Sequence, residues 1–200
     1  MRDKQVLGEV FALGLSGGKV TESVLASKLD EDRKQVTRTV ISLKSRGLLE
    51  RKKGNLKLTA RGRARLKVVF MGGGFEVIHP GHLHTIEQAK SLGDVLVIVI
   101  ARDSTIRERK SREPISNEGE RMWLISSLRQ VDVAILGVEG IIYETLEKVA
   151  PDIVALGYDQ YHIEKDVERE ALTRGMKLKV VRLSSSETPV KTSKLIAELS

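Results

Sequence analysis

Hydrophobic residues recur along the first third of the chain at the spacing of one helix face. This spacing predicts three helices, at residues 6–15, 22–29 and 31–46. Asp30 precedes the third helix and is a residue type that caps helix N-termini. Two short apolar runs follow, at 48–51 and 56–59, and the basic segment between them predicts a hairpin.

From residue 68 onward, short apolar runs alternate with segments of helical spacing. The predicted strands are residues 68–71, 95–101, 131–136, 153–156 and 178–182. The predicted helices are residues 83–92, 117–128, 141–149, 163–174 and 193–199. The run 95–101 is continuously apolar, which is typical of a parallel strand covered on both faces. The alternation predicts an α/β fold, with a doubly wound, Rossmann-like parallel sheet of about five strands.

Charge separates the same two parts of the chain. Residues 1–65 carry 16 lysines and arginines against 7 acidic residues, a net charge of +9. Residues 66–200 carry the remaining 18 basic and 20 acidic residues, a net charge of −2. This asymmetry predicts a small domain at 1–65 with an anionic partner, and a larger domain at 66–200.

Composition removes several classes of protein. The chain has no cysteine, which excludes disulfides, cysteine nucleophiles and thiolate metal sites. Its longest apolar run, 95–101, is much too short to span a bilayer, so we expect no membrane partner. Met1-Arg2-Asp3-Lys4-Gln5 lacks the form of a signal peptide, and we therefore expect a cytoplasmic protein.

One stretch combines several features of a phosphate site. Three glycines at 72–74 follow the first strand of the larger domain, and His79 and His82 stand where the next helix begins. Glycines let a ligand approach the backbone closely, and a helix N-terminus favours an anion. Histidines can donate hydrogen bonds to phosphate oxygens. The pattern predicts a nucleotide-phosphate site, although a tight turn with two surface histidines would leave the same pattern.

The same stretch carries a family resemblance. His79-Pro80-Gly81-His82 resembles the H-x-G-H signature of the nucleotidyltransferases that include cytidylyltransferases and several adenylyltransferases. Gly73-Gly74-Phe75-Glu76 resembles the G-T-F-D of that family, with Gly74 in place of threonine and Glu76 in place of aspartate. Residues 89–137 are similar to archaeal FAD synthases. The resemblance extends over about residues 67–200.

The resemblance implies roles for particular residues. His79 and His82 would stabilise charge at the reacting phosphorus, while Lys110 and Arg121 would hold the triphosphate. A surface position is the alternative for Arg121. The other residues that the resemblance implies for nucleotide binding are Gly73, Gly74, Phe75, Glu76, Gly81, Gly157, Asp159, Thr192 and Ser193.

Two of these implied sites have open alternatives. Gly157-Tyr158-Asp159-Gln160 is similar to a G-x-D-Q motif near the base and ribose, and Asp159 could instead cap a helix or help hold a metal. Thr192 and Ser193 lie in a turn that resembles the family's second phosphate cradle, and plain helix capping would use the same residues.

The implied reaction is transfer of a nucleotidyl group from an NTP to a phosphate monoester, with release of pyrophosphate. The first hypothesis is FMN adenylyltransferase, which makes FAD from ATP and FMN. The alternative is a cytidylyltransferase that uses CTP and glycerol 3-phosphate or another small alcohol phosphate. Mg²⁺ is the expected cofactor, and we assign no residue as its ligand.

The small basic domain resembles a winged helix-turn-helix. Leu58-Thr59-Ala60-Arg61-Gly62-Arg63 is similar to the L-T-x-x-G-R ending of winged-helix regulators. The resemblance makes 31–46 a recognition helix and 52–55 a wing. The expected DNA contacts are Arg33, Lys34, Thr37, Arg38, Lys52 and Lys53.

Two other uses of this domain stay open. A domain for dimerisation or docking would leave the same solvated helical face, and we expect a homodimer. The whole chain could also be a DNA-binding regulator that senses a nucleotide or a flavin.

Several residues are expected outside the site. Trp123, the single tryptophan, is expected in the core, and His84 at the surface. His162 has no evident partner in the sequence. Residues 102–112 are expected to form a charged loop at the ligand edge of the sheet.

Overall fold

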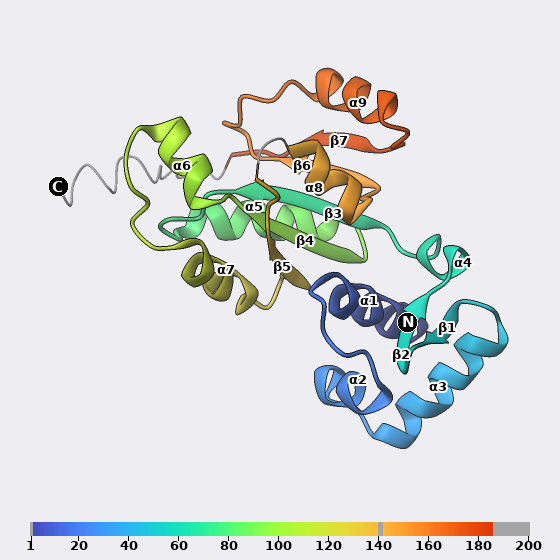
Figure 1. The fold of residues 1–200 in the computed structure, drawn as a ribbon. Coiled ribbons are helices and arrows are strands. Elements are labelled where there is room, and N and C mark those ends of the chain that lie inside the picture. Colours follow the sequence, from blue (N-terminus) through green and yellow to red (C-terminus); the bar gives the residue numbers. More distant parts are fainter. Residues whose placement is uncertain (1, 140–141, 186–200) are drawn as a thin grey trace. The chain divides into compact units, whose positions relative to one another are not determined.

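The computed structural model describes residues 2–139 and 142–185, and the chain divides into two compact units, Met1–Lys67 and Val68–Ser200. We describe each unit by itself (Figure 1). Within the described residues, no helix combines the length and apolar character that crossing a membrane requires.

The first unit consists of helices followed by a hairpin. Its elements are α1 (Arg2–Leu15), α2 (Glu22–Leu29), α3 (Arg33–Ser45), β1 (Leu49–Lys52), β2 (Asn55–Leu58) and α4 (Ala60–Arg63). The two strands pair antiparallel around a turn at Lys53 and Gly54. The apolar faces of these elements form the core, with Val6, Leu7, Val10, Leu25, Val36, Val40, Leu43 and Leu56 buried.

The cap of α3 corrects the sequence-based expectation. Asp30 is not the N-cap, because it closes α2 in a left-handed conformation with φ 50° and donates its N–H to Ala26. Asp32 caps α3 instead, and its carboxylate accepts from the N–H groups of Lys34 at 3.0 Å and Gln35 at 3.1 Å. The helix therefore begins at Arg33.

The second unit is an α/β fold with a five-stranded parallel sheet, as the sequence predicts. Its strands are β3 (Val68–Gly73), β4 (Val95–Ile100), β5 (Val133–Leu136), β6 (Ile153–Leu156) and β7 (Lys179–Arg182). Its helices are α5 (Pro80–Ser91), α6 (Asp103–Lys110), α7 (Glu118–Ser126), α8 (Ile142–Val149) and α9 (Glu164–Thr173). The predicted closing helix at 193–199 lies outside the described residues.

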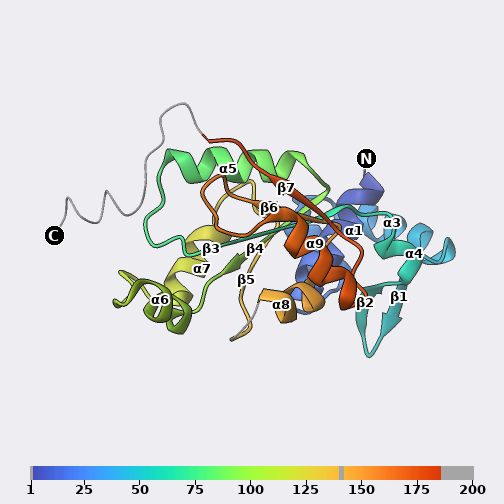
Figure 2. The same cartoon turned by 90° about the horizontal axis from the view of Figure 1, so that it is seen from above.

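Helices cover both faces of this sheet. Ile86 of α5 and Ile125 of α7 pack in one core cluster with alternate residues of β3 and β4, such as Met71 and Ile98. Figure 2 shows α5 on one side of the strands and α8 and α9 on the other. Every residue of β4 is buried, because its two faces are covered.

Strand order fixes where a ligand can bind. The sheet has the order β5-β4-β3-β6-β7, so the chain builds outward from β3 in one direction and then returns to start again at β6. Ligands of such sheets bind beyond the carboxyl ends of the strands where this reversal occurs. Here that place lies between β3 and β6.

Three local expectations in the second unit were wrong. The segment after β4 is helix α6, anchored by the buried Ile106, and not a loop. Helix α5 begins at Pro80, three residues earlier than predicted, because proline suits the first helical position. Trp123 is 71% exposed, because α7 buries Arg121 and Ile125, which leaves the residue between them on the outer face.

Candidate active site

The glycines at the end of β3 make room for a buried aromatic ring. Phe75 adopts φ 51° and is buried. A Cβ atom on Gly73 would lie 2.7 Å from the Phe75 ring, so this position requires glycine. The ring of Phe75 lies 5.4 Å from that of His82, measured between centroids. The glycines therefore shape the loop that supports the histidines.

The two histidines of the H-x-G-H segment meet at the N-terminus of α5. His79 is the N-cap residue, and the rings of His79 and His82 are 3.9 Å apart between centroids. Pro80 has no N–H, so Gly81 supplies the first backbone donor of the helix. His79, Gly81 and His82 line a cavity of about 420 Å³ that we call the histidine cavity. Its position at a helix N-terminus suits an anion.

Burial keeps these histidines neutral at pH 7. It lowers the pKa of His82 to about 4, assisted by the charge of His79, while Asp159 acts in the opposite direction. Burial also lowers the pKa of His79, again opposed by Asp159. The Nδ1 atom of His82 is enclosed without a hydrogen-bond partner among the described residues. A neutral imidazole there can still donate one hydrogen bond.

A buried carboxylate organises the cations beside the histidine cavity. The side chain of Glu76 is fully buried and pairs with Lys110, whose own side chain is 44% exposed. Both terminal nitrogens of Arg112 donate hydrogen bonds to the same carboxylate, at 2.7 and 3.1 Å. These contacts hold the pKa of Glu76 at about 2, against the opposing effect of burial. The carboxylate oxygens of Glu76 are therefore occupied by hydrogen bonds from the protein. Glu76 can influence a bound nucleotide only by positioning Lys110 and Arg112.

Arg121 has a different place from the one that the resemblance implies. Its side chain is 1% exposed and it does not line the cavity. Its guanidinium donates to the backbone oxygens of Gly74 at 2.5 Å and Ala101 at 2.8 Å, and to Asp103 at 2.7 Å. A fourth bond, from Nε, reaches Ser116 at 3.1 Å. A direct phosphate contact would compete with these bonds, which link Arg121 to the glycine loop and to the end of β4.

The loop after β6 closes the other side of the histidine cavity. Gln160 accepts from the N–H of Gly157 at 3.1 Å and donates to the backbone oxygen of Gly72 at 2.7 Å. This side chain therefore bridges the ends of β3 and β6, where the strand order reverses. Gly157 and Asp159 line the cavity from this loop, and Asp159 is exposed.

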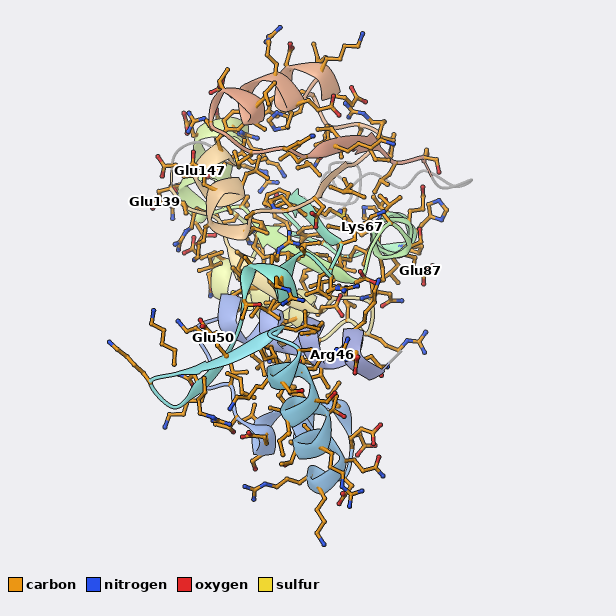
Figure 3. All side chains as sticks on the ribbon, turned by 90° about the vertical axis from the view of Figure 1, so that its right-hand side faces the viewer. Arg46, Glu50, Lys67, Glu87, Glu139 and Glu147 are labelled. Atoms are coloured by element: carbon orange, nitrogen blue, oxygen red, sulfur yellow. The ribbon has the colours of Figure 1, made fainter. Side chains whose placement is uncertain are left out.

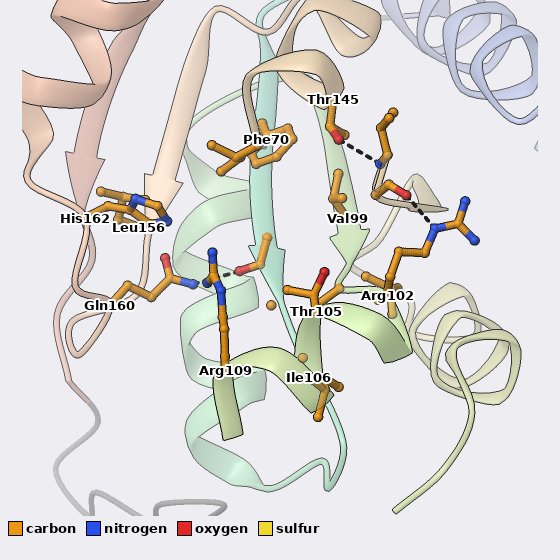
Figure 4. A pocket seen from close by; sticks show the side chains of 18 of the residues that line it. Phe70, Val99, Arg102, Thr105, Ile106, Arg109, Thr145, Leu156, Gln160 and His162 are labelled. Carbon is orange, nitrogen blue, oxygen red and sulfur yellow. Dashed lines mark hydrogen bonds between the residues drawn. The ribbon is translucent and has the colours of Figure 1, made fainter. Parts of the chain in front are cut away.

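A second cavity of about 250 Å³ shares a wall with the first. Figure 4 shows Phe70 and Val99 on the strands, and Arg109 extending from α6 toward Gln160. The wall common to both cavities is formed by Gly72, Gly73, Gly74, Lys110, Gln160 and Tyr161. We call this second space the ring cavity, for the aromatic side chains at its edge.

Most of the residues named from the sequence lie around the histidine cavity. They are Gly73, Gly74, Phe75, Glu76, His79, Gly81, His82, Lys110, Gly157 and Asp159. Thr192 and Ser193 lie outside the described residues. The residues expected to contact DNA belong to the first unit.

Sequence reasoning placed residues 102–112 at the ligand edge of the sheet but did not predict the ring cavity. Thr105 and Arg109 line this cavity without having been named as site residues, and so do Tyr161 and His162. The sequence feature that could have identified these residues is their position after β4 and β6, at the edge of the sheet where ligands bind. His84 was expected at the surface but is half-buried, with Nε2 enclosed.

The chain is similar in sequence to FAD synthases of other organisms. A FAD synthase of Aciduliprofundum boonei is 50% identical over 115 residues, which are 58% of this chain and 76% of that protein. A FAD synthase of Methanothermus fervidus is 44% identical over 132 residues, 64% of this chain and 90% of that protein.

A solved structure shares the fold. The lipopolysaccharide core biosynthesis protein of Thermoplasma volcanium matches with a TM-score of 0.59 and 43% identity, over 61% of this chain and 99% of that one. The family model described as cytidylyltransferase-like matches residues 70–198. The match spans well over half of the sequence, and the chain therefore belongs to the cytidylyltransferase-like family of nucleotidyltransferases.

Proposed function

We propose that this protein is an FMN adenylyltransferase, which transfers the adenylyl group of ATP to the phosphate of FMN and releases pyrophosphate. The observation that carries the proposal is the pair of adjacent imidazoles at the N-terminus of α5, which line the same cavity as Lys110. The similarity of 40–50% to archaeal FAD synthases supports FMN as the acceptor.

Positioning and charge stabilisation are sufficient for this reaction. A phosphate monoester has a second pKa of about 6, so the FMN phosphate is already an ionised nucleophile near neutral pH and needs no general base. Its oxygen attacks the α-phosphorus, the new P–O bond forms, and the bond to pyrophosphate breaks. His79 and His82 donate to the oxygens on which charge develops, and Lys110 neutralises part of that charge.

Magnesium fits the residues of the histidine cavity. Within residues 2–139 and 142–185, no group of three or more histidine or acidic side chains could hold a metal ion. Mg²⁺ is commonly held by substrate phosphates and water with one or two carboxylates, and Asp159 is an exposed carboxylate at this cavity. When bound, the ion would offset charge on the phosphates.

A crossed assay tests the proposed reaction. Pyrophosphate release is measured with ATP or CTP, each combined with FMN or glycerol 3-phosphate, in the presence of Mg²⁺. We expect pyrophosphate release only in the combination of ATP with FMN. Turnover with CTP and glycerol 3-phosphate would instead identify a cytidylyltransferase, and silence in every combination would contradict catalysis.

We also propose that the first unit is a winged helix that binds DNA. Lys34 and Arg38 lie on the exposed side of α3, Arg33 is exposed at its first turn, and Val36 and Val40 on the other side are buried. Thr37 lies half-buried between these sides, and Lys52 and Lys53 are exposed at the end of the hairpin. A basic helix face next to a basic hairpin offers many contacts to a phosphate backbone.

Salt dependence tests this second proposal. Binding of the full chain to DNA of its own promoter region is measured by mobility shift over a range of salt, with and without FMN. We expect affinity to fall steeply as salt rises, because phosphate contacts release counterions. Binding that is absent or insensitive to salt would contradict the proposal. Sedimentation of the same samples would test the expected homodimer.

A further inference from the structure

The floor of the ring cavity is apolar. The reacting phosphates of the proposed reaction have no use for an apolar surface. Phe70 of β3, Val99 of β4 and Leu156 of β6 form this floor. The described residues that line the cavity include three cations, Arg102, Arg109 and Lys110, and no carboxylate. The cavity therefore suits a large apolar or electron-rich group.

Flat side chains gather at the edge of this cavity. The guanidinium of Arg109 lies 5.0 Å from the centroid of the Tyr161 ring. The rings of Tyr161 and His162 are 4.1 Å apart, with 33° between their planes. Tyr161 is nevertheless 67% exposed. An exposed aromatic ring at a cavity edge can gain stacking and burial when a planar ligand enters.

Polar atoms near the floor already have partners. The hydroxyl of Thr145 accepts from the N–H of Val138 at 2.9 Å. Arg102 donates to the backbone oxygen of Gly137 at 2.7 Å, and also to Glu118. A ring with polar atoms on every edge, such as adenine, would leave some of them unpaired against this floor, at a cost of about 1–3 kcal/mol each. A ring with a hydrocarbon end avoids that cost.

We propose that the ring cavity holds the isoalloxazine ring of FMN, with its dimethylbenzene end on the apolar floor and Tyr161 stacked on it. This inference rests on the proposed function. The shared wall of glycines and Lys110 then lies between the flavin ring and the histidine cavity, so the FMN phosphate meets the α-phosphorus of ATP beside Lys110. Tyr161 becomes a determinant of acceptor specificity.

Direct binding measurements test the role of Tyr161. FMN and the unreactive analogue α,β-methylene-ATP are titrated separately into the wild type, Tyr161→Ala and Tyr161→Phe. Stacking quenches flavin fluorescence, which provides the readout for FMN. We expect Tyr161→Ala to weaken FMN binding roughly 5- to 20-fold, the scale of aromatic stacking, and Tyr161→Phe to bind as the wild type does. The affinity for the ATP analogue should not change.

Tyr143 offers a matched control. It also has a guanidinium over its ring, that of Arg174 at 5.1 Å, but it lines neither cavity among the described residues. Tyr143→Ala should leave FMN binding unchanged, and an equal loss in this variant would overturn the inference. Weaker binding of the ATP analogue to Tyr161→Ala would also overturn it, because Tyr161 lines both cavities and would then not be specific for the flavin.

The titration also separates this inference from the proposed reaction. If the wild type binds FMN in a Tyr161-dependent way but makes no FAD, the ring cavity is confirmed as a flavin site and the proposed catalysis fails. If FAD forms and neither affinity nor the KM for FMN responds to Tyr161→Ala, the proposed reaction stands and this inference fails.

Discussion

The two units of the chain place their charged groups in opposite ways. In the second unit, Glu76, Thr85, Arg121 and Thr145 are polar or charged and buried. In the part of the first unit that the structure describes, no polar or charged side chain is buried. There the charged side chains stay at least partly exposed, including Arg46 and Glu50, which Figure 3 labels.

This difference separates two kinds of anion recognition. A buried charge must be paired, and its partners then fix a loop or a lysine with little freedom, which suits the reacting phosphate of a small molecule. Exposed charged side chains need no partner within the protein and can adjust their positions to a long polyanion. Binding of such a polyanion is dominated by counterion release. The buried pairs of the second unit are suited to catalysis, and the exposed charges of the first unit are what the proposed DNA binding would require.

The largest expected effect comes from removing the guanidinium of Arg121. Arg121→Met leaves Asp103 and three backbone oxygens without a donor, so we expect a loss of about 3–5 kcal/mol in the free energy of unfolding. Urea denaturation followed by circular dichroism measures this loss. Arg169→Met is the control, since the Arg169 side chain is 75% exposed, and it should change stability by less than about 0.5 kcal/mol. Equal losses would remove the distinction between buried and exposed arginines.

The next effect concerns the rate and not the stability. Replacing His79 or His82 with alanine should lower kcat for FAD formation by roughly 10²- to 10³-fold, by analogy with lost oxyanion donors. His84→Ala is the matched control, because it lies on the same helix and lines neither cavity among the described residues. Full activity in either of the first two variants would refute charge stabilisation by that histidine.

Glu76→Gln should have a smaller effect that depends on pH. At pH 7 the variant leaves Lys110 and Arg112 without their anion, at a cost of about 1–3 kcal/mol in unfolding free energy. The pKa of Glu76 is about 2 in the folded protein and 4.5 ordinarily. The unfolded chain therefore binds more protons between these values, so the contribution of Glu76 is complete above pH 4.5 and is lost as the pH falls toward 2.

Urea denaturation at pH 7, 4 and 3 measures this dependence. The difference in unfolding free energy between the wild type and Glu76→Gln should become smaller as the pH falls. Glu113→Gln is the control, because the side chain of Glu113 is 74% exposed and pairs with Arg107 at the surface. A deficit that does not vary with pH would show that the charge of Glu76 does not stabilise the fold.

The smallest expected effect on stability lies in the first unit. Arg38→Ala on the exposed side of α3 should change the free energy of unfolding by less than about 0.5 kcal/mol. In mobility-shift titrations, the same variant should reduce the salt slope of DNA binding by about one, the value for one lost phosphate contact. Lys28→Ala on α2 is the control. Equal DNA effects in both variants would indicate diffuse attraction and not a binding face on α3.

The sequence by itself determined the parallel sheet and the position of the histidines. Continuous apolar runs such as β4 predict strands because burial on both faces leaves no polar position. His79 and His82 could be found because the chemistry of a helix N-terminus is local, involving residues within one turn of each other. The sign of the charge on the first unit is likewise a property of composition.

Which charged side chains are paired inside the protein and which stay exposed depends on how the elements pack together. Glu76 meets Lys110 and Arg112 from 34 and 36 positions away, and Arg121 reaches Gly74 across 47 positions. Such pairs depend on strand order and on which side of a helix faces the sheet, and no local pattern records either. The same reason explains why Trp123 was misplaced. It also explains why the ring cavity, assembled from α6 and from loops after β4 and β6, emerged only when the strands were set side by side.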